Sequence, residues 1–355
     1  LLPEDGTIGY NLNPFPQPLA FQDLYGNYLA MDVHGSFMTG TNVLTPDVSE
    51  YAVYKGVHYV QTNAGPAALK TTEAPFFFGV SVEPRVAAAV TNATLSYASG
   101  PEQPLPTDWG QFELEPVFAT SNQLAAAYPD GNYTVTMHTT HDGVHAAPLN
   151  LSGIAFPVPA RISNWTEAQS INSSNSFTLT WDSFSNASAG AVIQLTIRIV
   201  LSGGHEEVIS TPPPGSPDAL PASVNSYTIP AGILSAGRTY STELMFINLG
   251  PSNAVAYPGV AGLAAYVSIN QLGIRTAGAP VLPRIMILDH DKHHLSLRVS
   301  GVPNVPYTIE SADSVQSGLW FHQQSQRSTN GIIDFADWSI YSQGGRQFYR
   351  VREGW

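Results

Sequence analysis

Three histidines lie within one short stretch, His138-Thr-Thr-His-Asp-Gly-Val-His145, and imidazoles at this spacing could bind zinc or copper. The Asp142–Gly143 pair is typical of a hairpin turn, so we expect His138 and His145 to face each other across two strands, with His141 at the tip. The spacing matches no established metal motif, and a solvated hairpin explains the same residues. We therefore predict a polar hairpin that binds no metal.

A second polar cluster, Asp289-His-Asp-Lys-His-His294, places carboxylates at alternate positions, as at the start of a calcium-binding loop. A calcium loop of that kind also needs a glycine at its sixth position and a later bidentate glutamate, and neither is present. The cluster therefore predicts a turn between a strand at 285–288 and a strand at 295–299.

Signatures of the common enzyme classes are missing from the chain. His205-Glu-Glu-Val-Ile209 lacks the second histidine of a zinc-protease helix, and no nucleophile elbow, phosphate loop or dinucleotide fingerprint occurs. Glycoside hydrolysis needs only two carboxyl groups at ~5–10 Å, and any chain with 27 acidic residues could supply them. We expect no catalytic, cofactor-binding or metal site and no cofactor, with a hydrolase left open.

Aromatic residues suggest a different kind of site. The chain has 16 tyrosines, and its tryptophans outside the expected core are Trp109, Trp165, Trp320, Trp338 and Trp355. Exposed rings on a β-sandwich could stack on sugar rings, whereas packing within and between modules would account for the same residues. Polysaccharide binding is therefore an alternative function.

Composition narrows the class of protein further. The chain has 355 residues, a net charge of −13, and only 12% charged residues, against about 25% in typical domains. No basic run could neutralise phosphates, so we expect no nucleic-acid partner. There is no cysteine and no visible signal peptide or membrane span. We expect an extracellular or cell-surface protein, with Leu1 as the mature N-terminus if the chain is secreted.

Residue patterns predict an all-β chain of tandem β-sandwich modules. Apolar and polar residues alternate in short runs separated by Gly/Pro-rich connections, and only short helical turns are expected, near 123–127 and 166–170. The predicted segments are an extended N-terminal part at 1–72, an immunoglobulin-like sandwich at 73–157, a fibronectin-like sandwich at 158–278 and a small β-module at 279–355.

The third segment carries the strongest fold signal. Phe177-Thr-Leu-Thr-Trp181 alternates toward a tryptophan, 192–200 is a long apolar strand, and a glycine turn leads into a strand that opens on Tyr240. We predict that Trp181 and Tyr240 lie in one core. This layout resembles the fibronectin type III and immunoglobulin-like modules of secreted bacterial proteins. A similar glycine turn precedes Tyr133, whose strand should direct Tyr133, Val135 and Met137 to one face, which suggests related modules.

The last segment contains Tyr307-Thr-Ile-Glu-Ser311, Gly318-Leu-Trp320 and Arg346-Gln-Phe-Tyr-Arg-Val-Arg352. It resembles the short C-terminal β-module of large secreted proteins of environmental bacteria. With the third segment, the resemblance covers roughly residues 90–355, and it implies architecture without catalytic residues.

These observations favour a non-enzymatic structural or adhesive protein, such as a self-assembling filament or surface-layer subunit. The alternative is a polysaccharide-binding module set associated with a carbohydrate-active enzyme. Prolines at alternate positions in 13–18 keep the N-terminal segment extended. We expect its apolar residues to dock on a neighbouring copy or, nearly as readily, on their own chain: Ile8, Tyr10, Leu12 and Phe15.

Overall fold

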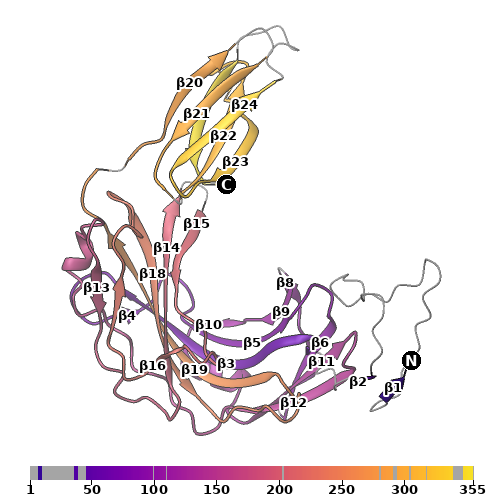
Figure 1. Ribbon diagram of the computed structural model, residues 1–355. Helices are drawn as coiled ribbons and strands as arrows, with labels where there is room; N and C mark the ends of the chain where they lie inside the picture. The colour runs from indigo at the N-terminus through magenta and orange to yellow at the C-terminus, as the bar shows by residue number, and fades with distance from the viewer. Residues whose placement is uncertain are drawn as a thin grey trace. The chain divides into compact units, whose positions relative to one another are not determined.

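The computed structural model (Figure 1) divides into two compact units, Leu1–Pro46 and Asp47–Trp355. In the first unit, β1 (Thr7–Gly9) pairs antiparallel with β2 (Ser36–Met38). The structure describes residues 7–9, 36–38, 45–98, 100–108, 110–201, 204–279, 281–290, 294–303, 305–316, 318–338 and 347–354.

An 11-stranded sheet forms the centre of the second unit, in the order β15-β14-β18-β19-β3-β5-β9-β8, with β4, β10 and β16 beside it. The β19–β3 pair is parallel, and it joins strands from the first and third predicted segments into one sheet. The strands are β3 (Val48–Gln61), β4 (Ala68–Leu69), β5 (Phe76–Pro84), β8 (Thr107–Asp108), β9 (Gln111–Leu114), β10 (Val117–Phe118), β14 (Val192–Leu201), β15 (Gly204–Ser210), β16 (Leu220–Pro221), β18 (Thr239–Leu249) and β19 (Ala261–Arg275).

A four-stranded sheet, β12-β11-β6-β7, shares a hydrophobic core with the β3–β5–β9 part of the large sheet. Tyr133, Val135 and Met137 point into this core, as their alternation predicted. The short helix begins with a capping box in which Thr120 and Gln123 bond each other's backbone, and it buries Leu124. The elements are β6 (Val90–Tyr97), β7 (Gln103–Pro104), α1 (Ser121–Ala127), β11 (Asn132–Thr139) and β12 (Val144–Asn150).

A second core lies where a two-stranded sheet faces the β14–β18–β19 part of the large sheet. Trp181 and Tyr240 are 2% and 1% exposed in this core, which confirms their prediction. The indole Nε1 of Trp181 donates to the carbonyl of Val224 at 3.1 Å, so its polar group is satisfied as well. The added elements are η1 (Glu167–Gln169), β13 (Phe177–Thr180) and β17 (Ser226–Ile229).

The C-terminal module consists of two three-stranded sheets, β20-β21-β24 and β23-β22-β25. The two strands predicted on either side of the 289–294 cluster pair antiparallel as β20 and β21, and β20 continues to His290; residues 291–293 lie outside the described residues. Arg238, the residue before β18, pairs with Glu353 at the end of β25. The strands are β20 (Arg284–His290), β21 (Leu295–Ser300), β22 (Pro306–Ala312), β23 (Phe321–Arg327), β24 (Ile332–Asp337) and β25 (Phe348–Glu353).

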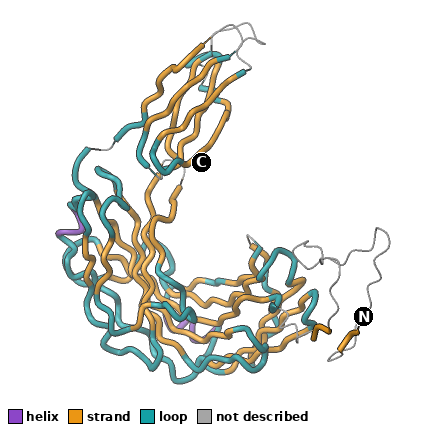
Figure 2. Tube along the Cα trace, viewed as in Figure 1, coloured by secondary structure: helices purple, strands orange, loops and turns teal. Residues whose placement is uncertain are grey.

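Each of the three sandwiches contains a tyrosine whose hydroxyl bonds the backbone four or five residues upstream. Tyr133 donates to the Pro129 carbonyl at 2.5 Å, and the hydroxyls of Tyr240 and Tyr307 accept from the backbone amides of Ser235 (2.6 Å) and Val302 (2.8 Å). This bond is the tyrosine corner of immunoglobulin-like sandwiches. With strands supplying nearly all the regular structure (Figure 2), the chain is an all-β array of β-sandwich modules.

Candidate functional site

The face of the large sheet that points away from both cores carries a groove of about 320 Å³, here called the outer groove. Its position follows from the ladder register, since Tyr54 lies beside Ala265, and Ala265 lies beside Leu249. Alternate residues of the same strands enter the cores, so the two faces of the sheet have separate apolar sets. The lining residues are Glu50, Ala52, Tyr54, His58, Phe77, Ser81, Glu115, Gln194, Pro214, Met245, Ile247, Leu249, Leu263, Ala265, Val267 and Ile269.

Two glycines give the groove its aromatic end. A Cβ on Gly56 would come within 1.9 Å of the Phe77 ring, and one on Gly79 within 2.1 Å of the Tyr54 ring. Each ring therefore lies across the neighbouring strand where a side chain is missing. The two rings meet edge to face, with centroids 6.0 Å apart, and they form an apolar surface beside the aliphatic floor.

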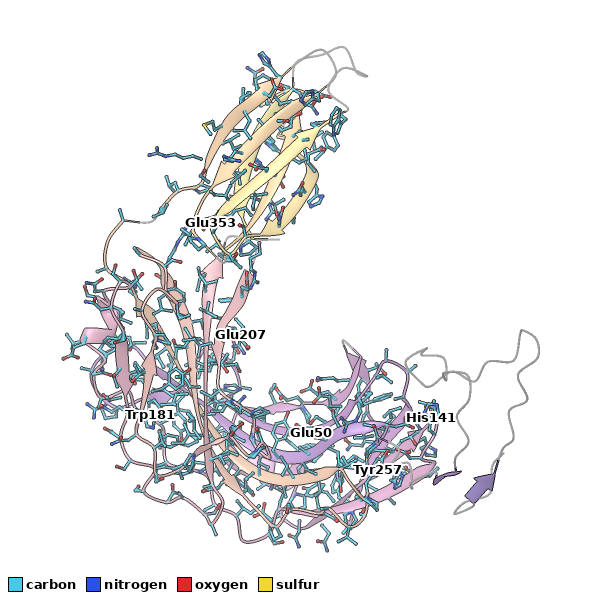
Figure 3. The ribbon with its side chains drawn as sticks, in the orientation of Figure 1. Glu50, His141, Trp181, Glu207, Tyr257 and Glu353 are labelled. Atoms are coloured by element: carbon cyan, nitrogen blue, oxygen red, sulfur yellow. The ribbon has the colours of Figure 1, made fainter. Side chains whose placement is uncertain are left out.

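Two carboxyl groups, Glu50 and Glu115, stand at the rim of the outer groove, and Figure 3 labels Glu50. Partial burial raises the pKa of Glu50, and so does Glu83, which lies directly opposite in the β3–β5 ladder. Partial burial and then the charge of Glu113 raise the pKa of Glu115, which also accepts a bond from Tyr54 at 3.3 Å. No lysine or arginine is among the residues that line the groove, so the rim is acidic.

A second polar cluster surrounds the tip of the β11–β12 hairpin, where Figure 3 labels His141 and Tyr257. Asp47 accepts bonds from the His141 ring at Nδ1 (2.9 Å) and from the His141 backbone amide (2.7 Å). Asp142 in turn accepts from the Asp47 amide (2.7 Å) and the Tyr257 hydroxyl (2.5 Å). These bonds fix the hairpin to the residue that precedes β3.

The charges in this cluster stabilise one another. Burial raises the pKa of Asp47, but the bonds from His141 and Asp142 outweigh it and hold that pKa below the ordinary value. The bond to Asp47 raises the pKa of His141. An imidazole held by an aspartate at Nδ1 could act as a general base at Nε2. No serine or threonine hydroxyl of the described residues bonds that Nε2.

The structure corrects the expectation that His138 and His145 face each other. His138 lies opposite Val144, and His145 lies opposite Met137, so the two imidazoles occupy successive positions on opposite faces of the sheet. The His145 ring stacks on Tyr257 instead, with centroids 3.7 Å apart. Within the part of the chain that the structure describes, no three acidic or histidine side chains could together hold a metal ion.

Other residues singled out from the sequence are dispersed over the fold. The His205–Ile209 run lies in strand β15, where Glu206 pairs with Arg327. Of the tryptophans, Trp165 packs against the second core, Trp320 lies under the Arg350 guanidinium at 4.2 Å, and Trp338 is 70% exposed. Trp109 and Trp355 lie outside the described residues.

The predicted assembly segment is only partly described. Ile8 lies in β1, opposite Phe37 of β2. Tyr10, Leu12 and Phe15 lie outside the described residues. No described helix is long and apolar enough to cross a membrane.

No family model matches the chain, and no curated protein matches it. Among solved structures, it is similar to the FN1–FN3 domains of chicken CNTN1, at 10% identity over 78% of this chain and 88% of that one, with a TM-score of 0.20. It is also similar to the central fibronectin-III array of RIM-binding protein, at 11% identity over 78% of this chain and 86% of that one, with a TM-score of 0.17. The ICAM-5 D1–D4 ectodomain fragment is similar at 11% identity over 86% of this chain and 77% of that one, also with a TM-score of 0.17. All three TM-scores are low, so the fold assignment rests on this chain's own ladders and cores.

Proposed function

We propose that this chain is a non-enzymatic structural or adhesive protein of the bacterial exterior that assembles with copies of itself, as a filament or surface-layer subunit. The outer groove carries this proposal. Strands with apolar residues on both faces are typical of sheets covered on both sides. Here β18 and β19 place Met245, Ile247 and Val267 on the face opposite the cores, where they form a separate apolar cluster that lines the groove.

The polar clusters favour binding over catalysis. Asp47 and His141 secure a hairpin, and Glu50 and Glu115 stand at the margin of an apolar surface. Interfaces between identical chains are more apolar than the rest of the protein surface, so an apolar groove favours assembly. The predicted boundaries are retained as a proposal, with one tyrosine corner in each of 73–157, 158–278 and 279–355.

Sedimentation velocity over a range of concentrations tests self-assembly. The full chain should form species larger than the 38.0 kDa monomer, and their share should rise with concentration. A chain that lacks residues 1–18 should remain monomeric with its β-sheet circular dichroism intact. A full chain that stays monomeric at the highest concentrations would refute the proposal.

A second candidate function is polysaccharide binding by the C-terminal module. Trp338 is 70% exposed and stacks on His294, with centroids 4.8 Å apart, so one face of the indole is supported while the side chain remains accessible. Such a ring could stack on a sugar. Pull-down on cellulose and chitin should retain the chain and lose the Trp338→Ala variant, whereas equal retention of both would reject this function.

A further inference from the structure

Strand β20 is an edge strand whose apolar side chains are left in water. In the described part of the chain it pairs with β21 alone, at the margin of the sheet β20-β21-β24 (Figure 1). Its run Ile285–Leu288 contains no charged or polar residue. Ile285 packs against a hydrophobic core, but Met286, Ile287 and Leu288 are 52%, 61% and 43% exposed. Such an edge presents unpaired backbone N–H and C=O groups beside apolar side chains, which favours pairing with another strand.

The other long edge strands of the described chain carry side chains that normally prevent such pairing. Charged residues and proline in an edge strand oppose the approach of a second strand. In β20 the run between its charged ends has a bulge at Leu288, which interrupts the ladder with β21 but leaves that side chain exposed. The protecting residues elsewhere are Glu206 and Glu207 in β15, Pro148 in β12, Asp334 in β24, Arg327 in β23, and Arg350 and Arg352 in β25.

The charges that flank the apolar run suit an antiparallel copy of the same strand. Arg284 precedes the run and Asp289 follows it. Within the described residues Arg284 has no ion pair, and the Asp289 carboxylate is 71% exposed, with the His294 ring 3.6 Å away. Antiparallel pairing about the Met286–Ile287 bond brings Arg284 of each copy beside Asp289 of the other, so one contact contains two opposite-charge pairs. Parallel pairing would place like charges side by side.

We propose that β20 is an edge through which two copies of the chain pair, antiparallel and about a two-fold axis. This inference rests on the proposed function, because it names a surface within the assembly. Each strand contributes seven residues, fewer than the roughly 20–30 residues a side of a stable interface. The contact therefore acts between copies that their N-terminal segments already hold together, at an effective concentration on the order of 1 mM. A chain without residues 1–18 stays monomeric for the same reason.

Charge reversal in the full chain tests this pairing, with sedimentation velocity across a concentration series as the measurement. Arg284→Asp and Asp289→Arg each place like charges together twice in the contact. Each should therefore raise the concentration at which half of the protein is assembled by about tenfold. The double variant should assemble as the natural chain does. An equimolar mixture of the two single variants should do so too, because a contact between unlike copies again contains two opposite-charge pairs.

A matched pair of lysine substitutions tests the edge itself. Ile287→Lys should weaken assembly to a similar extent, whereas Ile332→Lys should not, because Ile332 is 41% exposed on β24, the opposite edge of the same sheet. Equal effects of the two lysines would overturn the edge assignment.

Two further outcomes would also overturn it and leave self-assembly standing. One is that the single charge reversals assemble like the natural chain, and the other is that neither the double variant nor the mixture recovers. A natural chain that stays monomeric at the highest concentrations would instead refute the proposed function, and this contact with it.

Discussion

The buried lysine of β3 allows a sharp test of the energetics. The Lys55 side chain is 2% exposed, and its Nζ lies 2.5 Å from Oδ1 of Asp130 in the turn before β11. The Tyr266 hydroxyl donates to the same carboxylate. Asp130 is half exposed, so the two partners differ greatly in access to water. Removing Asp130 and removing Lys55 should therefore lower the free energy of unfolding by different amounts.

Loss of one partner of a buried ion pair costs ~3–5 kcal/mol, because the other charge stays buried without compensation. Asp130→Asn leaves the ammonium of Lys55 buried without a carboxylate to compensate its charge. Since solvent screens the half-exposed Asp130, we expect the lower end, about 3 kcal/mol. Lys55→Met should cost about 1 kcal/mol or less, because Asp130 can hydrate and the methionine fills the space. The double variant, with both substitutions, should have the same free energy of unfolding as Lys55→Met.

Hydrogen exchange of the β6 and β11 amides measures the opening free energy of this sandwich separately from the other modules. The bonds from Lys55 and Tyr266 outweigh burial and hold the pKa of Asp130 below its ordinary value. A carboxyl group whose pKa is lower in the folded state stabilises the fold at pH values above its unfolded pKa of about 4. This stabilisation is lost as the pH falls through the pKa of the folded state. The difference between the natural chain and Asp130→Asn should thus shrink below about pH 4. A larger loss for Lys55→Met than for Asp130→Asn would refute the reasoning.

Three further predictions concern the cores and the hairpin tip. Trp181→Ala should lower the free energy of unfolding in urea by ~3–5 kcal/mol, because Trp181 is 2% exposed, and a loss below about 1 kcal/mol would contradict its core assignment. Gly56→Ala should cost ~1–3 kcal/mol by displacing the Phe77 ring, whereas Gly273→Ala, with its nearest atom at 3.9 Å, should be nearly neutral, and equal effects would reject the close approach. Asp47→Asn should lower the pKa of His141 in an NMR titration. The raised pKa stabilises the fold below the unfolded value of about 6.5, and that stability is lost as pH rises through the folded value, so an unchanged pKa would show that Asp47 is not the cause.

Local patterns predicted much of the fold. Alternation placed Tyr133, Val135 and Met137 in one core, and the run toward Trp181 placed it in another. Both signals are local, since strand periodicity depends only on neighbouring residues. The parallel β19–β3 ladder pairs residues about 200 positions apart, and no local pattern encodes that register.

The candidate sites depended on the same long-range pairings. Asp47 meets His141 across 94 positions, and Lys55 meets Asp130 across 75, so neither pair is visible in sequence spacing. One signal was present, because Gly56 and Gly79 interrupt strand-like runs, and an interior glycine often marks the close approach of another group. The apolar run of β18 was a second signal, because Leu244 and Phe246 alternate with Met245 and Ile247, which predicts apolar clusters on both faces of the sheet.

Electron microscopy of the full chain beside a chain of residues 19–355 tests the central claim, self-assembly through the N-terminal segment, most directly. The account predicts ordered filaments or sheets for the full chain and dispersed particles with the same β-sandwich density for the shortened chain. Dispersed particles for both chains, or identical assemblies for both, would contradict it.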